Sequence, residues 1–312
     1  MPAFNALCCF LGALIWGTAF VAQKVGGDEM GPFIFNGLRF FLGFIVVFPL
    51  VVIRARKRRD RIRAGDTRVD AVNTKRAVYG GIVCGVFLTA ASALQQYSLQ
   101  FVEVGKAGFL TALYIILVPV ISFLVTRKSN IRVLIGALIA TAGLYCLSVS
   151  SSMSIAKADI LLILCALMFS FQILAVGYFA GDTDCFELAA SQFLTAGILG
   201  TALAFYMESP ALTMFTGPGI LSLLYAGLFS SGIAYTLQVV GQKGADPAIA
   251  SLIMSLESVI SAVSGFLFLH QTLSPRELAG CVLMFLSIVL VQLPAGKKRE
   301  AGTKSELRES NG

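Results

Sequence analysis

Ten stretches of about 20 mainly apolar residues, each long enough to cross the hydrocarbon core of a membrane as an α-helix, follow one another through this 312-residue chain. The runs are continuous, which excludes a transmembrane barrel, because barrel strands alternate in polarity over about 10 residues. Only 13% of the residues are charged, whereas soluble domains carry roughly 25%. The sequence therefore predicts an all-α membrane protein with ten transmembrane helices. The stretches lie at residues 4–23, 33–53, 77–99, 105–125, 132–150, 159–179, 186–207, 219–240, 248–269 and 277–294.

The distribution of basic residues predicts the orientation of these helices. Nineteen of the 24 lysines and arginines fall in the two termini or in the connections on the same side as the termini, and ten of them lie in the loop 54–76. Basic connections stay in the cytoplasm, so we expect both termini to be cytoplasmic, in the plasma membrane and specifically a bacterial inner membrane. The basic loop is then interpreted as an anchor near anionic lipid rather than as a nucleic-acid site.

Neither end of the chain carries a recognisable targeting or folded segment. The N-terminal residues MPAFN hold no lysine or arginine before the first apolar run, so we expect no removable signal peptide. The tail 296–312 is polar and has no periodicity, and we expect it to be disordered and cytoplasmic. The seven cysteines lack the paired spacing of a metal site or a disulfide framework, so the sequence predicts neither a bound metal nor a cofactor.

The chain repeats itself at a nearly constant offset. LVPVIS at 117–122 recurs as LESVIS at 256–261, and four special positions of the third stretch recur 142 residues later in the eighth. This pattern predicts two five-helix halves, 1–150 and 151–295. Because five is odd, the second half is inverted in the membrane, and inverted repeats are a recurring architecture of secondary transporters.

Several phrases together resemble a known family. They are LIWGTAFVAQK in the first stretch, LRFF in the second, GKAGFLTALYIILVP in the fourth, and LESVISAVSGFLFL followed by SPRELAG near the C-terminus. The order of these phrases, together with the repeat, makes the chain similar to the EamA branch of the drug/metabolite transporter superfamily over about residues 4–294. The resemblance implies the export of metabolites or amino acids.

Glu257 is the most informative polar residue, because it stands near the middle of its stretch, in the copy LESVIS of the repeated phrase. A charged group at the bilayer centre costs on the order of 3 kcal/mol to insert. We interpret Glu257 either as the group that binds a cationic part of the substrate or as a proton carrier that couples transport. The alternative is a protonated acid that donates one hydrogen bond to a neighbouring helix. Arg39, Lys106 or a substrate ammonium could neutralise it.

Other polar and aromatic side chains within the stretches complete the predicted site. Thr89, Ser92, Gln96 and Gln100 form one stripe, and Ser231, Tyr235, Gln238 and Gln242 form its repeat mate, so we expect the two stripes to line a shared path. Trp16 lies in mid-span, away from the interface where tryptophans usually anchor. A cavity of this kind suits a small organic solute such as an amino acid or amine. The predicted substrate-binding residues are Trp16, Asn36, Arg39, Gln96, Tyr114, Gln172, Tyr235, Gln238 and Glu257.

The sequence thus favours a secondary transporter working by alternating access, and a homodimer is one option for its assembly. A passive channel is one alternative, although a channel commonly uses symmetric rings of charge or carbonyls. An intramembrane enzyme is another, although the chain has one histidine and no one-turn pair of acids near the midplane. No Gly-rich segment ends in Gly-Lys-Ser or Gly-Lys-Thr, so we do not expect direct drive by ATP.

Overall fold

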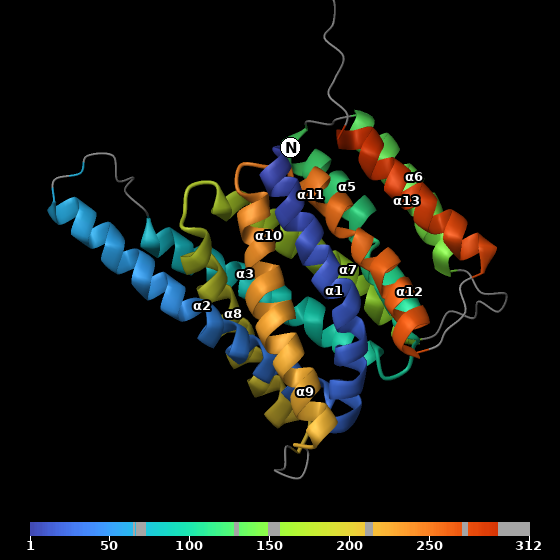
Figure 1. Cartoon of the computed structure of the whole chain (residues 1–312), viewed down its shortest axis with the longest axis horizontal. Coiled ribbons are helices and arrows are strands. Elements are labelled where there is room, and N and C mark those ends of the chain that lie inside the picture. Colours follow the sequence, from blue (N-terminus) through green and yellow to red (C-terminus); the bar gives the residue numbers. More distant parts are fainter. Residues whose placement is uncertain are drawn as a thin grey trace, which may run out of the picture.

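The computed structural model describes residues 1–64, 66, 73–127, 131–148, 157–209, 215–269 and 274–292, and in these ranges the chain is helical without any strand. Figure 1 shows the helices gathered side by side in one bundle. The helices are α1 Ala3–Met30, α2 Pro32–Arg63, α3 Thr74–Ser98, α4 Val104–Thr111, α5 Tyr114–Thr126, α6 Ile131–Ser148, α7 Lys157–Ala180, α8 Cys185–Met207, α9 Gly217–Tyr225, the π-helix η2 Ala226–Ala234, α10 Tyr235–Gln242, α11 Pro247–Met254, α12 Leu256–Leu269 and α13 Pro275–Gln292.

Eight helical stretches in the described part of the chain are long and apolar enough to cross a membrane. Three of them are composite, because α4 continues into α5, α9 into η2 and α10, and α11 into α12. Shorter apolar helices occupy Ile131–Cys146 and Leu278–Val291, which coincide with the fifth and tenth predicted stretches and pack against each other as the pair α6 and α13 at one side of the bundle (Figure 1). The protein is therefore an all-helical, multi-pass membrane protein.

One residue joins α1 to α2. Gly31 has a φ of 91° and donates its N–H to the carbonyl of Gly27 at 3.0 Å, a conformation that favours glycine. Pro32 then begins α2, where its missing N–H is not needed. The free N–H groups of Phe33 and Ile34 donate to the two carboxylate oxygens of Glu208, each at 2.9 Å, so the residue after α8 caps α2.

Two of the composite stretches are interrupted at the residues that precede candidate site residues. Between α4 and α5, the N–H of Ile115 bonds the carbonyl of Ala112 three residues back, at 3.0 Å. Between α11 and α12, the Ser255 hydroxyl donates to the Leu252 carbonyl at 2.7 Å, a bond through which serine competes with the helix backbone. Pro119 lies inside α5, so it is not the residue at which the fourth stretch is interrupted.

Glycine permits the closest approach between helices. An added Cβ on Gly200 of α8 would lie 3.0 Å from Cα of Gly37 in α2, and one on Gly143 of α6 would lie 2.7 Å from the carbonyl oxygen of Gly280 in α13. Helices in lipid associate through such close van der Waals contact, because lipid is as apolar as their side chains. Large apolar side chains such as Phe4, Leu138 and Phe285 instead remain exposed on the outside of the bundle.

The long helix α2 corrects one prediction about the basic loop. Residues 54–63, which were assigned to the loop 54–76, continue α2 as helix. With 32 residues and a rise of about 1.5 Å per residue, α2 is roughly 48 Å long, which exceeds the roughly 30 Å hydrocarbon core. Its basic end therefore projects beyond the bundle (Figure 1). Parts of the predicted features lie outside the described residues. These parts are residues 65 and 67–72, the ends of the fifth and tenth predicted stretches, and the tail 296–312.

Candidate functional site: a polar cavity in the bundle

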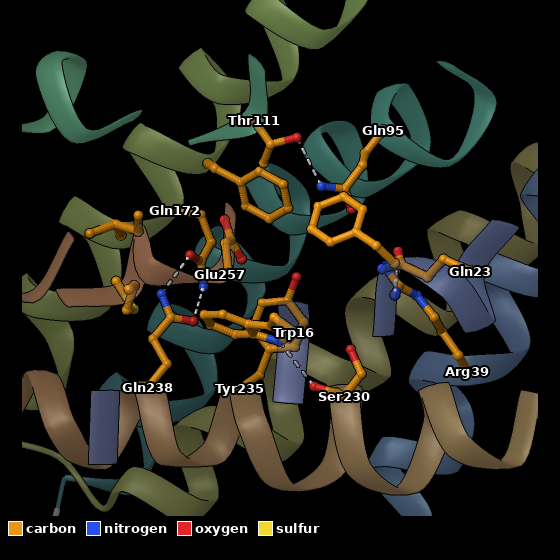
Figure 2. A pocket seen from close by; sticks show the side chains of 14 residues that line it. Trp16, Gln23, Arg39, Gln95, Thr111, Gln172, Ser230, Tyr235, Gln238 and Glu257 are labelled. Carbon is orange, nitrogen blue, oxygen red and sulfur yellow. Dashed lines mark hydrogen bonds between the residues drawn. The ribbon is translucent and has the colours of Figure 1, made fainter. Parts of the chain in front are cut away.

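A cavity of about 30 Å³ lies in the bundle, between residues of seven of the ten predicted stretches. Its walls combine aromatic rings with amide, hydroxyl and charged groups, as Figure 2 shows. One water molecule needs about 10–15 Å³, so a cavity of this size has room for water, and a larger solute needs its walls to move apart. The lining residues are Trp16, Phe20, Gln23, Arg39, Gln95, Thr111, Phe169, Gln172, Ile173, Ser230, Tyr235, Gln238, Met254 and Glu257.

Glu257 reaches the cavity from the first turn of α12, two residues after the interruption at Ser255. Its side chain is 6% exposed, and its Oε1 atom accepts a hydrogen bond of 2.9 Å from the Tyr114 hydroxyl. Tyr114 is the first residue of α5, directly after the interruption of the fourth stretch. The two interruptions thus bring together a carboxylate and a phenol that are 143 residues apart in the chain.

An aromatic wall stands beside the carboxylate. The Trp16 and Tyr235 rings lie 4.7 Å apart between centroids, and Trp16 Nε1 donates to the backbone carbonyl of Ser230 at 3.2 Å. Ser230 belongs to the π-helix η2, and π-helical turns are frequent at functional sites. Trp16 is followed by Gly17, which lies against the backbone of Glu257. The tryptophan therefore forms part of a cavity wall and not an interfacial anchor.

Three glutamines form a hydrogen-bonded group at one end of the cavity. Gln172 of α7 and Gln238 of α10 exchange two hydrogen bonds, of 3.0 Å and 3.3 Å. Gln172 Nε2 also donates to Oε1 of Gln192 in α8 at 2.9 Å. Glutamine can donate and accept at once, so this group fixes amide dipoles on the cavity wall without adding charge.

Arg39 lies at the opposite end of the cavity in Figure 2, next to Gln23. It is 1% exposed, which shows that this long side chain does not extend outward to the membrane surface. Its Nη1 atom donates to Gln23 Oε1 at 2.9 Å and its Nε atom to Asn36 Oδ1 at 3.1 Å. Asn36 in turn donates to the Ser92 hydroxyl at 3.0 Å. A buried cation is thus held by neutral amides.

Six of the nine predicted site residues line the cavity, and three lie behind its surface. Asn36 and Tyr114 contact it through Arg39 and Glu257, whereas Gln96 donates to the backbone carbonyl of Gln23 at 2.6 Å. In the third stretch, Gln95 takes the lining position and bonds Thr111 at 3.1 Å. The stripe containing Gln96 contributes no lining residue to this cavity, because α3 presents Gln95 there. The lining residues not predicted are Phe20, Gln23, Gln95, Thr111, Phe169, Ile173, Ser230 and Met254.

Lys106 lies apart from the cavity and is paired. Its Nζ atom lies 2.8 Å from Asp159 Oδ1 and 2.9 Å from Oδ2. The Asp159 side chain is 8% exposed and that of Lys106 is 35% exposed. This ion pair joins α4 to α7, so Lys106 does not neutralise Glu257.

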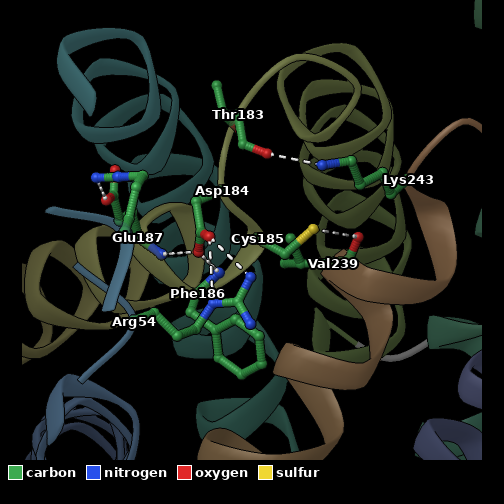
Figure 3. A network of polar contacts seen from close by, with 9 residues as sticks. Arg54, Thr183, Asp184, Cys185, Phe186, Glu187, Val239 and Lys243 are labelled. Carbon is green, nitrogen blue, oxygen red and sulfur yellow. Dashed lines mark hydrogen bonds and ion pairs between the residues drawn. The ribbon is translucent and has the colours of Figure 1, made fainter. Parts of the chain in front are cut away.

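Ion pairs and hydrogen bonds link the helices at the end of the bundle where α7 meets α8 (Figure 3). Arg54 and Arg58, on the projecting part of α2, pair with Asp184 at 3.2 Å and with Glu187 at 2.9 Å. Asp184 also caps α8 by accepting the N–H of Phe186 at 2.9 Å. The sequence did not single out these acids, because ion pairs at the ends of helices have no periodic signature.

The same end is tied to α10 and α1. Lys243 Nζ donates to the carbonyl of Thr183 at 3.1 Å, and the Asn5 side chain donates to the carbonyls of Gly241 and Lys243, each at 2.9 Å. Gln242 donates to the carbonyl of Ile173 at 3.0 Å. Helices from both predicted halves are therefore joined at this end.

A helical bundle with a partly charged internal cavity defines a polytopic membrane protein of the kind that handles small solutes. The sequence model of the EamA-like transporter family matches residues 3–149 and again residues 156–293. Together these segments cover most of the chain, so the chain belongs to the EamA-like transporter family, and it is a membrane transporter of the drug/metabolite type.

Individual relatives agree with this assignment. The chain is 29% identical over 284 residues to an uncharacterized transporter of Archaeoglobus fulgidus, covering 91% of this chain and 84% of the relative. It is 23% identical to the uncharacterized transporter YoaV of Bacillus subtilis, covering 89% and 92% of the two chains. A solved structure with 19% sequence identity superposes with a TM-score of 0.74 over 94% of this chain and 97% of the other, which supports the fold.

Proposed function

We propose that this protein is a secondary transporter that exports a small organic metabolite, such as an amino acid or an amine, across the plasma membrane by alternating access. The observation that carries this proposal is the cavity inside the bundle, where a buried carboxylate, a buried guanidinium and aromatic rings face the same space. Binding sites of secondary transporters lie near the bilayer midplane between repeated halves.

The proposed arrangement is ten membrane-spanning helices in two inverted halves with both termini in the cytoplasm. The family model matches once in each half, which supports the repeat. The interruption at Ala112 and Leu113 and the interruption at Ser255 are 142 to 143 residues apart, close to the offset of 139 between LVPVIS and LESVIS in the same two stretches. Interrupted helices at corresponding positions of two halves are a feature of transporter binding sites.

Glu257 is the proposed group that binds a cationic part of the solute or carries the coupling proton. It is the one carboxylate among the cavity-lining residues, and its neighbour Tyr114 donates a hydrogen bond to it. The rings of Trp16 and Tyr235 could add cation–π attraction to a solute ammonium, since such rings attract cations over their faces.

The experiment compares export by cells that overproduce the wild type, Glu257→Gln or Glu103→Gln. Cells are loaded with a mixture of amino acids, amines and nucleosides, and the medium is analysed by mass spectrometry. Glu103 is an exposed carboxylate at the start of α4, so its replacement is the matched control. Membrane levels of the three proteins are compared by immunoblot.

We expect a few solutes to appear outside with the wild type and with Glu103→Gln, and to be reduced at least tenfold with Glu257→Gln. If Glu257→Gln exports as much solute as the wild type, Glu257 has only a structural role. If no solute exceeds the level of empty cells despite membrane expression, export of these three classes is refuted. Saturable counterflow in vesicles separates a carrier from a passive channel, which would pass current without saturation.

A further inference from the structure

Arg39 is a buried cation whose hydrogen-bond partners in the structure carry no charge. Gln23 and Asn36 each accept one hydrogen bond from it, and the Phe40 ring lies 4.7 Å from its Cζ atom. Within the described residues, no carboxylate lies within ion-pair distance of Arg39. Because removing a charge from water is costly unless it is paired, the position calls for an anion.

The Nη2 atom of Arg39 is buried and has no hydrogen-bond partner. Buried donors are normally satisfied, and each exception asks for an explanation such as a missing ligand. Arg39 is among the residues that line the cavity. The nitrogen left without a partner therefore belongs to a side chain that borders the internal cavity.

The other basic side chains near the outer ends of these helices are already engaged. Lys106 pairs with Asp159 at 2.8 Å. Lys24 donates to the carbonyl of Leu99 at 2.7 Å and lies 3.6 Å from Asp28. Arg39 is thus the basic residue of the cavity lining, and its engaged atoms, Nε and Nη1, are held by amides that fix the plane of the guanidinium.

We propose that Arg39 is an anion subsite that binds an oxyanion group of the transported solute through Nη2, with Gln23 and Asn36 as positioning residues. This inference rests on the proposed transport function, and it narrows the substrates to solutes that carry a carboxylate, phosphate or sulfonate group. Arginine suits such groups because its planar N–H donors match oxyanion geometry. Glu257, which lies away from Arg39 in Figure 2, then meets the other end of the solute.

Gln23 and Asn36 orient the guanidinium without supplying charge. Asn36 is itself fixed by its bond to Ser92 at 3.0 Å, and the backbone carbonyl of Gln23 accepts from Gln96 at 2.6 Å. This chain of contacts gives Gln96 and Asn36, which do not line the cavity, an indirect function in binding. Replacing Gln23 by Met should therefore weaken anion binding by less than replacing Arg39 does.

The test measures the thermal stability of the purified full chain in detergent as each probe is titrated. The probes form two matched sets: phenylalanine, phenethylamine and 3-phenylpropionate, and leucine, isoamylamine and 4-methylpentanoate. Inorganic phosphate and sulfate serve as minimal anions, and phosphatidylglycerol serves as a lipid headgroup. The variants are Arg39→Gln, Arg39→Lys, Gln23→Met and Glu257→Gln.

We expect acid-bearing probes to raise the unfolding temperature of the wild type, and Arg39→Gln to weaken their apparent affinity at least tenfold. Amine probes should keep their affinity within twofold in Arg39→Gln and lose it in Glu257→Gln. Arg39→Lys, which keeps the charge, should fall between the wild type and Arg39→Gln. If Arg39→Gln does not fold, the affinities of acid-bearing and amine probes are compared in Arg39→Lys and Gln23→Met instead.

Three results would overturn the anion subsite. One is unchanged affinity for acid-bearing probes in a folded Arg39→Gln protein. Another is a wild type that binds none of the organic acids, phosphate or sulfate. The third is stabilisation by phosphatidylglycerol alone, which would replace a solute site by a lipid site. Export by wild-type cells is measured separately, so a failure of the subsite is distinguished from a failure of the transport function.

Discussion

Replacing Gly17 by alanine tests the contact that holds Trp16 and Glu257 side by side. An added Cβ on Gly17 would lie 2.5 Å from Cβ of Ile260 and 2.8 Å from the backbone oxygen of Glu257. Both atoms are fixed to the backbone of α12, so no side-chain rotation can move them away. Ordinary contact begins at 3.4 Å, and α1 and α12 must therefore separate by roughly 0.6 to 0.9 Å, the difference from that distance.

The cost can be estimated against a matched change in the same helix. Overpacking by one methyl group costs about 1–3 kcal/mol, while alanine gains up to about 1 kcal/mol over glycine in helix propensity. An added Cβ on Gly12 of α1 would meet the Ala234 carbonyl oxygen at 3.4 Å, which is ordinary contact. Gly12→Ala keeps the propensity gain without the overlap, so the two variants should differ by about 2 kcal/mol, the midpoint of the overpacking range.

The assay is thermal and denaturant unfolding of both purified variants in the same detergent, with export per folded molecule measured in parallel. We expect Gly17→Ala to be less stable than the wild type and to export less, because the separation displaces Glu257 from the aromatic wall. Gly12→Ala should match or exceed the wild type. Equal stability of the two variants would refute the inferred helix contact.

Two further predictions concern single hydrogen bonds and ion pairs. Tyr114→Phe removes the donor to Glu257. Because a hydrogen bond contributes roughly 0.5–1.5 kcal/mol, the free energy of unfolding should fall by about that amount and export should fall; unchanged values would contradict this contact. Arg58→Gln leaves Glu187, 8% exposed, without its partner and should lower stability by about 1–3 kcal/mol, the cost of leaving a buried polar group unsatisfied. Arg59→Gln, an exposed position on the same helix, should have little effect in the same unfolding assay.

Hydropathy predicted the helices of this protein well, because the bilayer requires continuous apolar stretches that satisfy their own backbone hydrogen bonds. The family model matches residues 3–149 and 156–293, while the division into halves at 1–150 and 151–295 stays a prediction. The interruptions at Ala112–Leu113 and at Ser255 were not predicted. The first involves a backbone bond from Ile115 to Ala112 and the second a bond from the Ser255 hydroxyl to a backbone carbonyl, and hydropathy registers neither.

The sequence predicted the types of residue in the candidate site better than it predicted which positions line the cavity. A polar residue inside a membrane helix must face protein or water, which is why Glu257, Arg39 and Gln238 were singled out from the sequence. Gln95 and Gln96 are adjacent and chemically identical, so their order in the chain could not decide which lines the cavity.

The sequence by itself therefore determined which segments are apolar and long enough to cross the membrane as helices, and which ionisable groups lie within them. The tertiary structure decided the rotation of each helix about its axis, and with it the pairing of Tyr114 with Glu257 and the lack of a partner at Arg39 Nη2. The physical reason is that successive helical residues point about 100° apart, so the packing of neighbouring helices alone selects the face that meets the cavity.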